Sequence, residues 1–540
     1  MGRAVSSRRR IPPGRVPRDP LFLLGTVCGL WRHPVRLLVL DAAPRASRVP
    51  RPPRGRPVVT TIVFGAYLAA IFAIGAVALR RTRTEGDYWI AGGKLGWLLG
   101  GATLAATHAS AGTYIGTVGV IHTVGWEFTW LVLFIPLSYW FMAGVLGPRF
   151  ARTRELTLPA FIERRYYSRR ARALAAVVIL IAATVYVQAQ VIAGGLIAET
   201  VFGIPAVWGM VVFTVILLAY TAIGGMVAVV YTDLVQLVVM VIGALVAVPM
   251  VFRLLGGPGP LFAAVETLRP EAFEFGALPG VLLFTMGISF LLGGIATPEK
   301  LVRLYAMRGQ REIRRGLFLA MIVATGVNLL VFLIALGAMG LFPILPSGDL
   351  AMPLIASYAL PPILGTVLLA AVVSAIMSTV DSLLLVAGSA LSHDLLGVLR
   401  PGASPRARML AARFGILIVG IAPLVLILSG VGEGELVQFI VLLFTAIMAS
   451  AFFVPVVLGV LWRGLTREGA LAAMVGGVTG VFVWQSGALP WPGWGPELVH
   501  PAAPGVLVSL VLGVAVSRFT AAPPESALAP YFARPAEDPR

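Results

Sequence analysis

The chain consists of long apolar runs separated by short polar stretches. Runs of about 20 apolar residues recur along almost its whole length, and a helix of that length crosses a bilayer. We therefore predict an all-α polytopic membrane protein with about 13 spans. The spans are expected roughly at residues 58–79, 95–122, 127–148, 173–200, 205–223, 233–254, 278–297, 317–341, 361–395, 411–430, 435–460, 468–486 and 502–517.

Composition supports this class and excludes others. The 540 residues are 58% hydrophobic and 12% charged, whereas soluble proteins carry about 25% charged residues. A single Cys, Cys28, offers neither a disulfide framework nor a thiolate cluster, and the five His residues are scattered. The sequence contains no GxxxxGK[ST] motif, so nothing indicates an ATP-driven pump.

Positive charge alternates between the loops. "RRTRTEGDYWIAGGK", "RFARTRELTLPAFIERRYYSRRARA" and "EKLVRLYAMRGQREIRRG" are rich in Arg, while "HTVGWE", "ETVFGIP" and "SGVGEGE" contain no Lys or Arg. By the positive-inside rule, the N-terminus lies outside a plasma membrane and the C-terminus in the cytoplasm. We expect a transmembrane domain over residues 58–518 and a disordered cytoplasmic tail over residues 519–540.

The first 57 residues do not fit this orientation. They contain 13 Arg and 2 Asp, so +11 of the net charge of +18 lies in one Pro-rich stretch. We predict a disordered extension over residues 1–57, and leave open a cleaved signal peptide or a translation start near Val58. This uneven distribution of charge argues against a nucleic-acid partner.

Polar side chains gather in the predicted span at residues 361–395. Ser378, Thr379, Asp381 and Ser382 fall within five positions of an otherwise apolar helix. Hydroxyls can simply bond within a helix or to a neighbouring one, but a carboxylate at this depth is costly and usually faces a cavity, an ion or a partner. Hydroxyl and carbonyl oxygens beside a carboxylate are hard ligands, which suit sodium.

A second span, at residues 95–122, carries glycines and polar groups together. "AATHASAGTYIGTVGVIHTVG" contains Gly112, Gly116, Gly119 and Gly125, and glycine weakens a helix by about 1 kcal/mol per residue. The segment is either a glycine-packed interface or a broken helix whose free backbone groups bind ions and solutes. A further carboxylate, Asp233, begins the span at residues 233–254, where it could equally cap the helix.

Four stretches resemble the sodium:solute symporter family: "EGDYWIAGGKLGW", "TLPAFIERRYYSRRARA", "GGMVAVVYTDLVQ" and "MSTVDSLLLVAGSALSHDL". The resemblance runs from about Val58 to about Val516. It implies a leucine-transporter-type fold of two inverted five-helix repeats, at about residues 95–254 and 278–460. The spans at residues 95–122 and 278–297 would be broken, the latter at Gly293, Gly294 and Pro298.

The resemblance also implies binding residues. The main sodium site would comprise the carbonyls of Ala106, Ala109 and Ala375 with the hydroxyls of Ser378 and Thr379. Asp233, Asp381 and Ser382 would form a second cation site, although the two carboxylates could instead serve a proton or pair with an Arg. The substrate-binding residues would be Ser110, Thr113, Tyr114, Tyr186, Gln190 and Phe290.

The expected function is sodium-coupled symport of a small organic solute by alternating access. Amides at a helix break attract carboxylates, so a monocarboxylate or pantothenate-like acid is the first choice. A proline-like neutral amino acid or a sugar is the alternative, and a transporter-like sensor is less favoured. We expect Na⁺ as the coupling ion, the lipid bilayer as environment, and no organic cofactor, enzymatic activity or obligate protein partner.

Overall fold

A computed structural model describes residues 56–79, 85–153, 155–432, 434–488 and 495–532. The expectations for residues 1–55 lie outside this part of the chain. Within it, nine helical segments are long and apolar enough to cross a bilayer. Each of the predicted spans corresponds to helical structure, which confirms the all-α membrane class.

The first group of helices runs to residue 254. It comprises α3 (Arg56–Leu79), α4 (Glu85–Ile90), α5 (Trp97–His108), η2 (Gly112–Thr117), α6 (Val118–Val124), η3 (Trp126–Leu133), α7 (Phe134–Phe141), η4 (Met142–Leu146), α8 (Gly147–Thr153), α9 (Leu158–Tyr166), α10 (Arg169–Phe202) and α11 (Ala206–Leu254).

The second group completes the described chain. It comprises α12 (Pro258–Leu268), η5 (Pro270–Phe273), α13 (Gly280–Ala296), α14 (Pro298–Ala306), α15 (Gln310–Leu341), η6 (Gly348–Leu350), α16 (Ala351–Leu354), η7 (Ile355–Ala359), α17 (Pro362–Ser389), η8 (Ala390–Leu395), α18 (Leu396–Leu399), α19 (Pro405–Leu428), α20 (Val437–Met448), η9 (Ala449–Leu458), α21 (Gly459–Leu461), α22 (Arg467–Gln485), α23 (Ala502–Arg518) and α24 (Glu525–Phe532).

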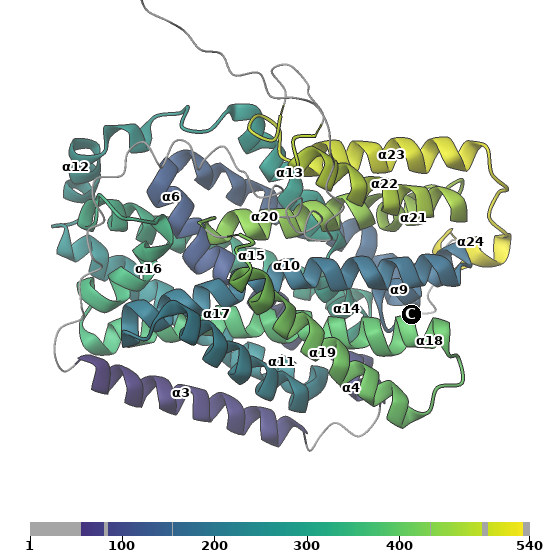
Figure 1. Ribbon diagram of the computed structural model, residues 1–540, viewed down its shortest axis with the longest axis horizontal. Coiled ribbons are helices and arrows are strands. Elements are labelled where there is room, and N and C mark those ends of the chain that lie inside the picture. The colour runs from purple at the N-terminus through teal and green to yellow at the C-terminus, as the bar shows by residue number, and fades with distance from the viewer. Residues whose placement is uncertain (1–55, 80–84, 154, 433, 489–494, 533–540) are drawn as a thin grey trace, which may run out of the picture.

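The helices surround a buried centre. In Figure 1, α3 runs along one side of the molecule, and α22 and α23 run along the opposite side. Between them, α5 packs on α15, α11 on α17, and α10 on α20. The middle of α17 is completely enclosed, with Ser378 and Thr379 at 0% exposure. The polar face predicted on this span therefore lies inside the protein and does not contact lipid.

Within α11, two helices meet at a kink, so the two predicted spans correspond to the apolar helices Ala206–Ala219 and Gly225–Leu254. The sequence indicated a loop between residues 223 and 233, but the chain leaves helical geometry at Gly225 (φ 64°, ψ 179°) and is helical from there on. A side chain is strained at this positive φ, and a Cβ there would lie 2.6 Å from the ring of Tyr88. Glycine therefore permits a sharp bend without a loop.

Two helices break in the interior of the protein, as the resemblance implied, although the glycines do not make the breaks. The first helix, α5, ends at His108, and Ala109 is extended (ψ 115°). The second, α13, ends before Thr297, which is also extended (ψ 129°). Gly116 instead allows close approach, because a Cβ there would lie 2.7 Å from the backbone nitrogen of Gln438.

Two stretches differ from their predicted character. "EKLVRLYA", expected in an Arg-rich loop, forms most of α14, and every residue of that helix is buried. After the break at Thr297 the chain resumes at once as the buried helix α14, so the charged residues of this stretch lie within the protein. The tail was predicted to be disordered over residues 519–540, but α24 packs on α8 and α9. Tyr531 is 2% exposed there, with its ring 5.4 Å from that of Phe161.

Asp349 lies in η6, outside the membrane-spanning segments, and contacts α6 and α20. Its Oδ2 accepts a hydrogen bond of 2.9 Å from the backbone nitrogen of Val437, at the start of α20. Its Oδ1 lies against Gly119 of α6, so closely that a Cβ at that glycine would clash with it. Burial raises the pKa of the Asp349 carboxyl from 3.8 to about 7, despite the opposing effect of the Val437 amide.

This raised pKa makes stability depend on pH. Below about pH 4 the folded and unfolded chains both keep the proton, whereas towards pH 7 only the folded chain keeps it, so stability falls as pH rises. The full difference corresponds to about 4 kcal/mol. Asp349→Asn should therefore gain thermal stability relative to wild type between pH 5 and pH 8. Exposed Glu266 provides the control, Glu266→Gln; an equal offset at every pH for Asp349→Asn would contradict the assignment.

Candidate functional site

The five residues assigned to sodium meet where α17 crosses the break in α5. The Ser378 hydroxyl donates to the carbonyl oxygen of Ala106 at 2.9 Å and to that of Ala375 at 3.2 Å. The Thr379 hydroxyl lies 3.0 Å from the Ala375 carbonyl oxygen and 3.3 Å from that of Ala109. Three carbonyl and two hydroxyl oxygens thus converge on one buried point.

The sequence explains this convergence. Because α5 ends at His108, carbonyls of its last turn lose their partners within the helix. Ser378 and Thr379 follow Ala375 on α17 by three and four positions, so both hydroxyls reach the Ala375 carbonyl one turn earlier. Small, hard oxygen ligands without a thiolate or imidazole match an alkali cation. When the hydroxyls rotate, their lone pairs can turn towards such a cation.

Of the three residues predicted for a second cation site, Asp233 and Ser382 contact the side chain of Arg303. The Arg303 guanidinium on α14 pairs with Asp233 Oδ2 at 3.1 Å and donates to the Ser382 hydroxyl at 2.6 Å. Thr103 of α5 donates to the same oxygen of Asp233. Arg303 is 1% exposed and Asp233 is 0% exposed. Of the alternatives considered for Asp233, pairing with an Arg is therefore the one this geometry favours.

Asp381 does not take part in this ion pair. Its Oδ1 accepts a hydrogen bond of 2.5 Å from the Thr221 hydroxyl of α11, and its Oδ2 has no hydrogen-bond partner among the described residues. Adjacent positions on a helix point about 100° apart, so Asp381 faces α11 while Ser382 faces Arg303. The three residues grouped by sequence thus divide between two environments.

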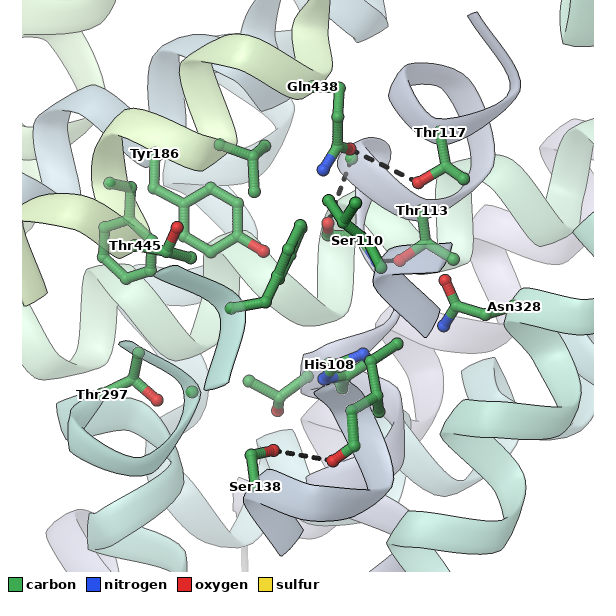
Figure 2. A pocket seen from close by; sticks show the side chains of 18 of the residues that line it. His108, Ser110, Thr113, Thr117, Ser138, Tyr186, Thr297, Asn328, Gln438 and Thr445 are labelled. Atoms are coloured by element: carbon green, nitrogen blue, oxygen red, sulfur yellow. Dashed lines mark hydrogen bonds between the residues drawn. The ribbon is translucent and has the colours of Figure 1, made fainter. Parts of the chain in front are cut away.

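A cavity lies beside the residues predicted to bind sodium, and residues on both sides of the break line it, Thr107 and His108 before it and Ser110 after it. Of the residues predicted to bind substrate, Ser110, Thr113, Tyr186 and Phe290 line it. In Figure 2, Tyr186 and Thr445 face Ser110 and Thr113 across the open space. The Tyr186 ring stacks on that of Phe444, with centroids 4.4 Å apart. The cavity therefore has hydroxyl groups on both walls and stacked aromatic rings on one of them.

Two predicted substrate residues do not line this cavity. The Tyr114 hydroxyl donates to the Met240 carbonyl of α11 at 2.8 Å, and its side chain is 0% exposed. Gln190 Oε1 accepts a hydrogen bond of 3.0 Å from the backbone nitrogen of Ala111. Neither side chain is therefore part of the cavity wall, because proximity to the break in sequence does not fix which way a side chain points. Both residues instead support the backbone around the break.

Several lining residues were missed from sequence. Glu299 and Lys300 line the cavity but were overlooked because α14 was assigned to a loop, and Asn328 of α15 and Gln438 of α20 line it as well. Lys300 is 7% exposed, and its Nζ lies 5.6 Å from the centroid of the Tyr139 ring. The composition could have drawn attention to Lys300, because the chain has 42 Lys and Arg residues, of which only Lys94 and Lys300 are Lys.

Comparisons with known proteins identify related transporters. The chain is 29% identical over 475 residues to the sodium/pantothenate symporter of Escherichia coli (strain K12), covering 85% of this chain and 96% of that protein. It is 27% identical over 477 residues to the osmoregulated proline transporter OpuE of Bacillus subtilis (strain 168), covering 86% and 95%.

The fold and the family follow from two further matches. A Na⁺-coupled sialic acid symporter, solved in a substrate-bound outward-open state, superposes with a TM-score of 0.73. The match has 19% identity and covers 86% of this chain and 98% of that one, so it shows a shared leucine-transporter-type fold. The family model described as "Sodium:solute symporter family" matches residues 88–477. The chain therefore belongs to the sodium:solute symporter family, membrane transporters that use Na⁺ as the coupling ion.

Proposed function

We propose that this protein takes up a small organic solute bearing a carboxylate, driven by sodium bound between α5 and α17. The observation that carries this proposal is the position of the break in α5. On one side of it, Ala106 and Ala109 present carbonyls to Ser378 and Thr379. On the other, Ser110 lines the cavity. Ion and solute would thus bind to the same few residues of backbone.

This arrangement supplies a route for coupling. A sodium ion held by Ala109 and Thr379 would favour conformations in which α5 and α17 are in contact. An ion shifts a conformational equilibrium only by its difference in affinity for the two states. Since Ser110 follows Ala109 directly, fixing the carbonyl of Ala109 also fixes the cavity wall that the solute meets. Sodium binding would therefore increase affinity for the solute, and the effect is reciprocal.

The carboxylate is proposed on grounds that differ from the original expectation. Amides at the break were expected to attract it, but those of Ala111 and Gly112 already donate to the side chains of Gln190 and Ser110. The cation in the cavity wall is instead Lys300. A pantothenate-like acid and a neutral amino acid both carry the carboxylate that it would bind, whereas a sugar does not.

The orientation is also a proposal. The positive-inside rule favours the Arg-rich segments, such as residues 308–315 before and within α15, on the cytoplasmic side. The C-terminus would then lie in the cytoplasm of a plasma membrane, and the N-terminus outside. The break residues would lie between the two faces, as alternating access requires.

Removing the two hydroxyls should weaken sodium binding selectively. Ser378→Ala/Thr379→Ala leaves a dehydrated cation without two of five ligands, so half-maximal uptake should require about tenfold more sodium or higher. Uptake into proteoliposomes at varied sodium measures this. Ser389→Ala removes a hydroxyl that bonds only within α17 and should leave sodium dependence unchanged. An unaltered sodium requirement in the double variant would refute the site.

The Asp233–Arg303 pair should act as a structural unit. Asp233→Asn leaves a buried guanidinium without its carboxylate, and breaking such a pair costs about 3–5 kcal/mol. Asp233→Asn/Arg303→Met removes both charges and should recover much of the lost thermal stability in detergent, with the same sodium stoichiometry as wild type. If Asp233 held a second coupling ion, the double variant would instead transport fewer sodium ions per solute.

A further inference from the structure

Two opposite charges stand side by side in the cavity wall. Glu299 and Lys300 are consecutive in the first turn of α14, and both line the cavity. They are 2% and 7% exposed, respectively. Glu299 Oε2 has no hydrogen-bond partner among the described residues. No ion pair at 4.0 Å or less involves either side chain within that part of the chain.

Structural roles do not explain this pair. A glutamate in the first turn of a helix is favoured by the helix dipole, so Glu299 alone could serve packing. A lysine in the same turn is disfavoured by that dipole, and its burial without a paired anion is costly. The neighbouring cation on α14, Arg303, is already compensated by Asp233. Lys300 and Glu299 attract each other as neighbours, but within the described part of the chain Lys300 has no ion pair of the kind that joins Arg303 to Asp233.

The use of lysine at this position also requires a reason. The chain supplies 40 of its 42 basic residues as Arg, and the other lysine, Lys94, is exposed. Arg presents a planar fork of five donors, whereas Lys presents a compact point charge on a flexible stem. A compact ammonium is suited to a ligand that must fit close to the helix and its adjacent carboxylate.

We propose that Glu299 and Lys300 recognise a zwitterionic solute, with its carboxylate at Lys300 and its ammonium at Glu299. This inference rests on the proposed sodium-coupled uptake and specifies its substrate class. One carbon separates the two charged groups of an α-amino acid, and two successive positions of α14 offer the matching opposite charges. Phe128, Leu131 and Phe290 also line the cavity, so the side chain of the amino acid would be apolar.

Other solute classes fit this pair less well. A simple acid would neutralise Lys300 but meet the repulsion of Glu299 in a site shielded from water. A cation would be attracted by Glu299 and repelled by Lys300, and a sugar would offer no charged group to either side chain. Only a zwitterion provides a group of opposite charge to both side chains at once. The proposed solute is therefore an amino acid rather than a simple acid.

The test uses matched ligands on the full-length protein. Apolar α-amino acids, their N-acetyl derivatives and methyl esters, and pantothenate are compared by thermal stabilisation in detergent, with and without sodium. The free amino acid should stabilise the protein in sodium, while its N-acetyl derivative, which lacks the positive charge, and its ester, which lacks the negative charge, should bind at least about tenfold more weakly.

Variants then assign the charges. Lys300→Met and Glu299→Gln should each weaken binding of the amino acid by about tenfold or more. Glu299→Gln should also narrow the gap between the amino acid and its N-acetyl derivative, because the repulsion of an anion is removed. Lys94→Met, which removes the other lysine, should change neither affinity nor uptake.

Failure of this inference differs from failure of the proposed function. Sodium-dependent binding of pantothenate or an N-acetyl derivative in preference to every amino acid would overturn the zwitterion and leave sodium coupling intact. So would unchanged selectivity in both variants. The ligand series on wild type gives this answer even if a variant does not fold. Loss of sodium stabilisation by Ser378→Ala/Thr379→Ala in the absence of solute tests the sodium site separately.

Discussion

The structure depends on one constraint: at membrane depth, an interrupted helix must find partners for its backbone groups within the protein. At the break in α5, the hydroxyls of Ser378 and Thr379 contact the carbonyls of Ala106 and Ala109. These contacts allow an interrupted helix to persist away from water. The same oxygens can be given up to a cation, so the groups that stabilise the break are those that would bind the coupling ion.

Buried charges in this protein divide into compensated and uncompensated groups. Arg303 and Asp233 neutralise each other and connect α14 to α11, with Ser382 of α17 completing the contact. Glu299 and Lys300 lie on the same short helix but have no such ion pair among the described residues. Since an isolated buried charge is costly, charges that the fold does not compensate are those expected to meet a ligand. One short helix thus combines a structural ion pair with the charges proposed to meet the solute.

Local patterns were enough to predict much of this architecture. Apolar runs located the helical spans, and the resemblance to the family predicted Ser378 and Thr379 together with the carbonyls that they contact in the structure. The position at which α5 breaks could not be predicted in this way. The glycines lie beyond it, at close contacts such as that of Gly116 with Gln438, and only the fold shows which helix approaches a given glycine.

The directions of side chains and the depth of α14 were also beyond sequence reasoning. Tyr114 lies next to cavity residues in sequence, but its side chain points towards α11. Glu299, Lys300 and Arg303 look like an Arg-rich loop unless the helix is known to resume after Thr297. Likewise, nothing local to the tail indicates that Tyr531 packs against Phe161, a contact between residues far apart in the chain.

The most direct test of the central claim is a high-resolution experimental map of the protein in sodium, compared with one in choline, which is too large for the site. Density for an ion should appear in sodium alone, bounded by the carbonyls of Ala106, Ala109 and Ala375 and the hydroxyls of Ser378 and Thr379. An ion resolved elsewhere, with those hydroxyls still donating to the carbonyls in both maps, would contradict the proposed coupling site.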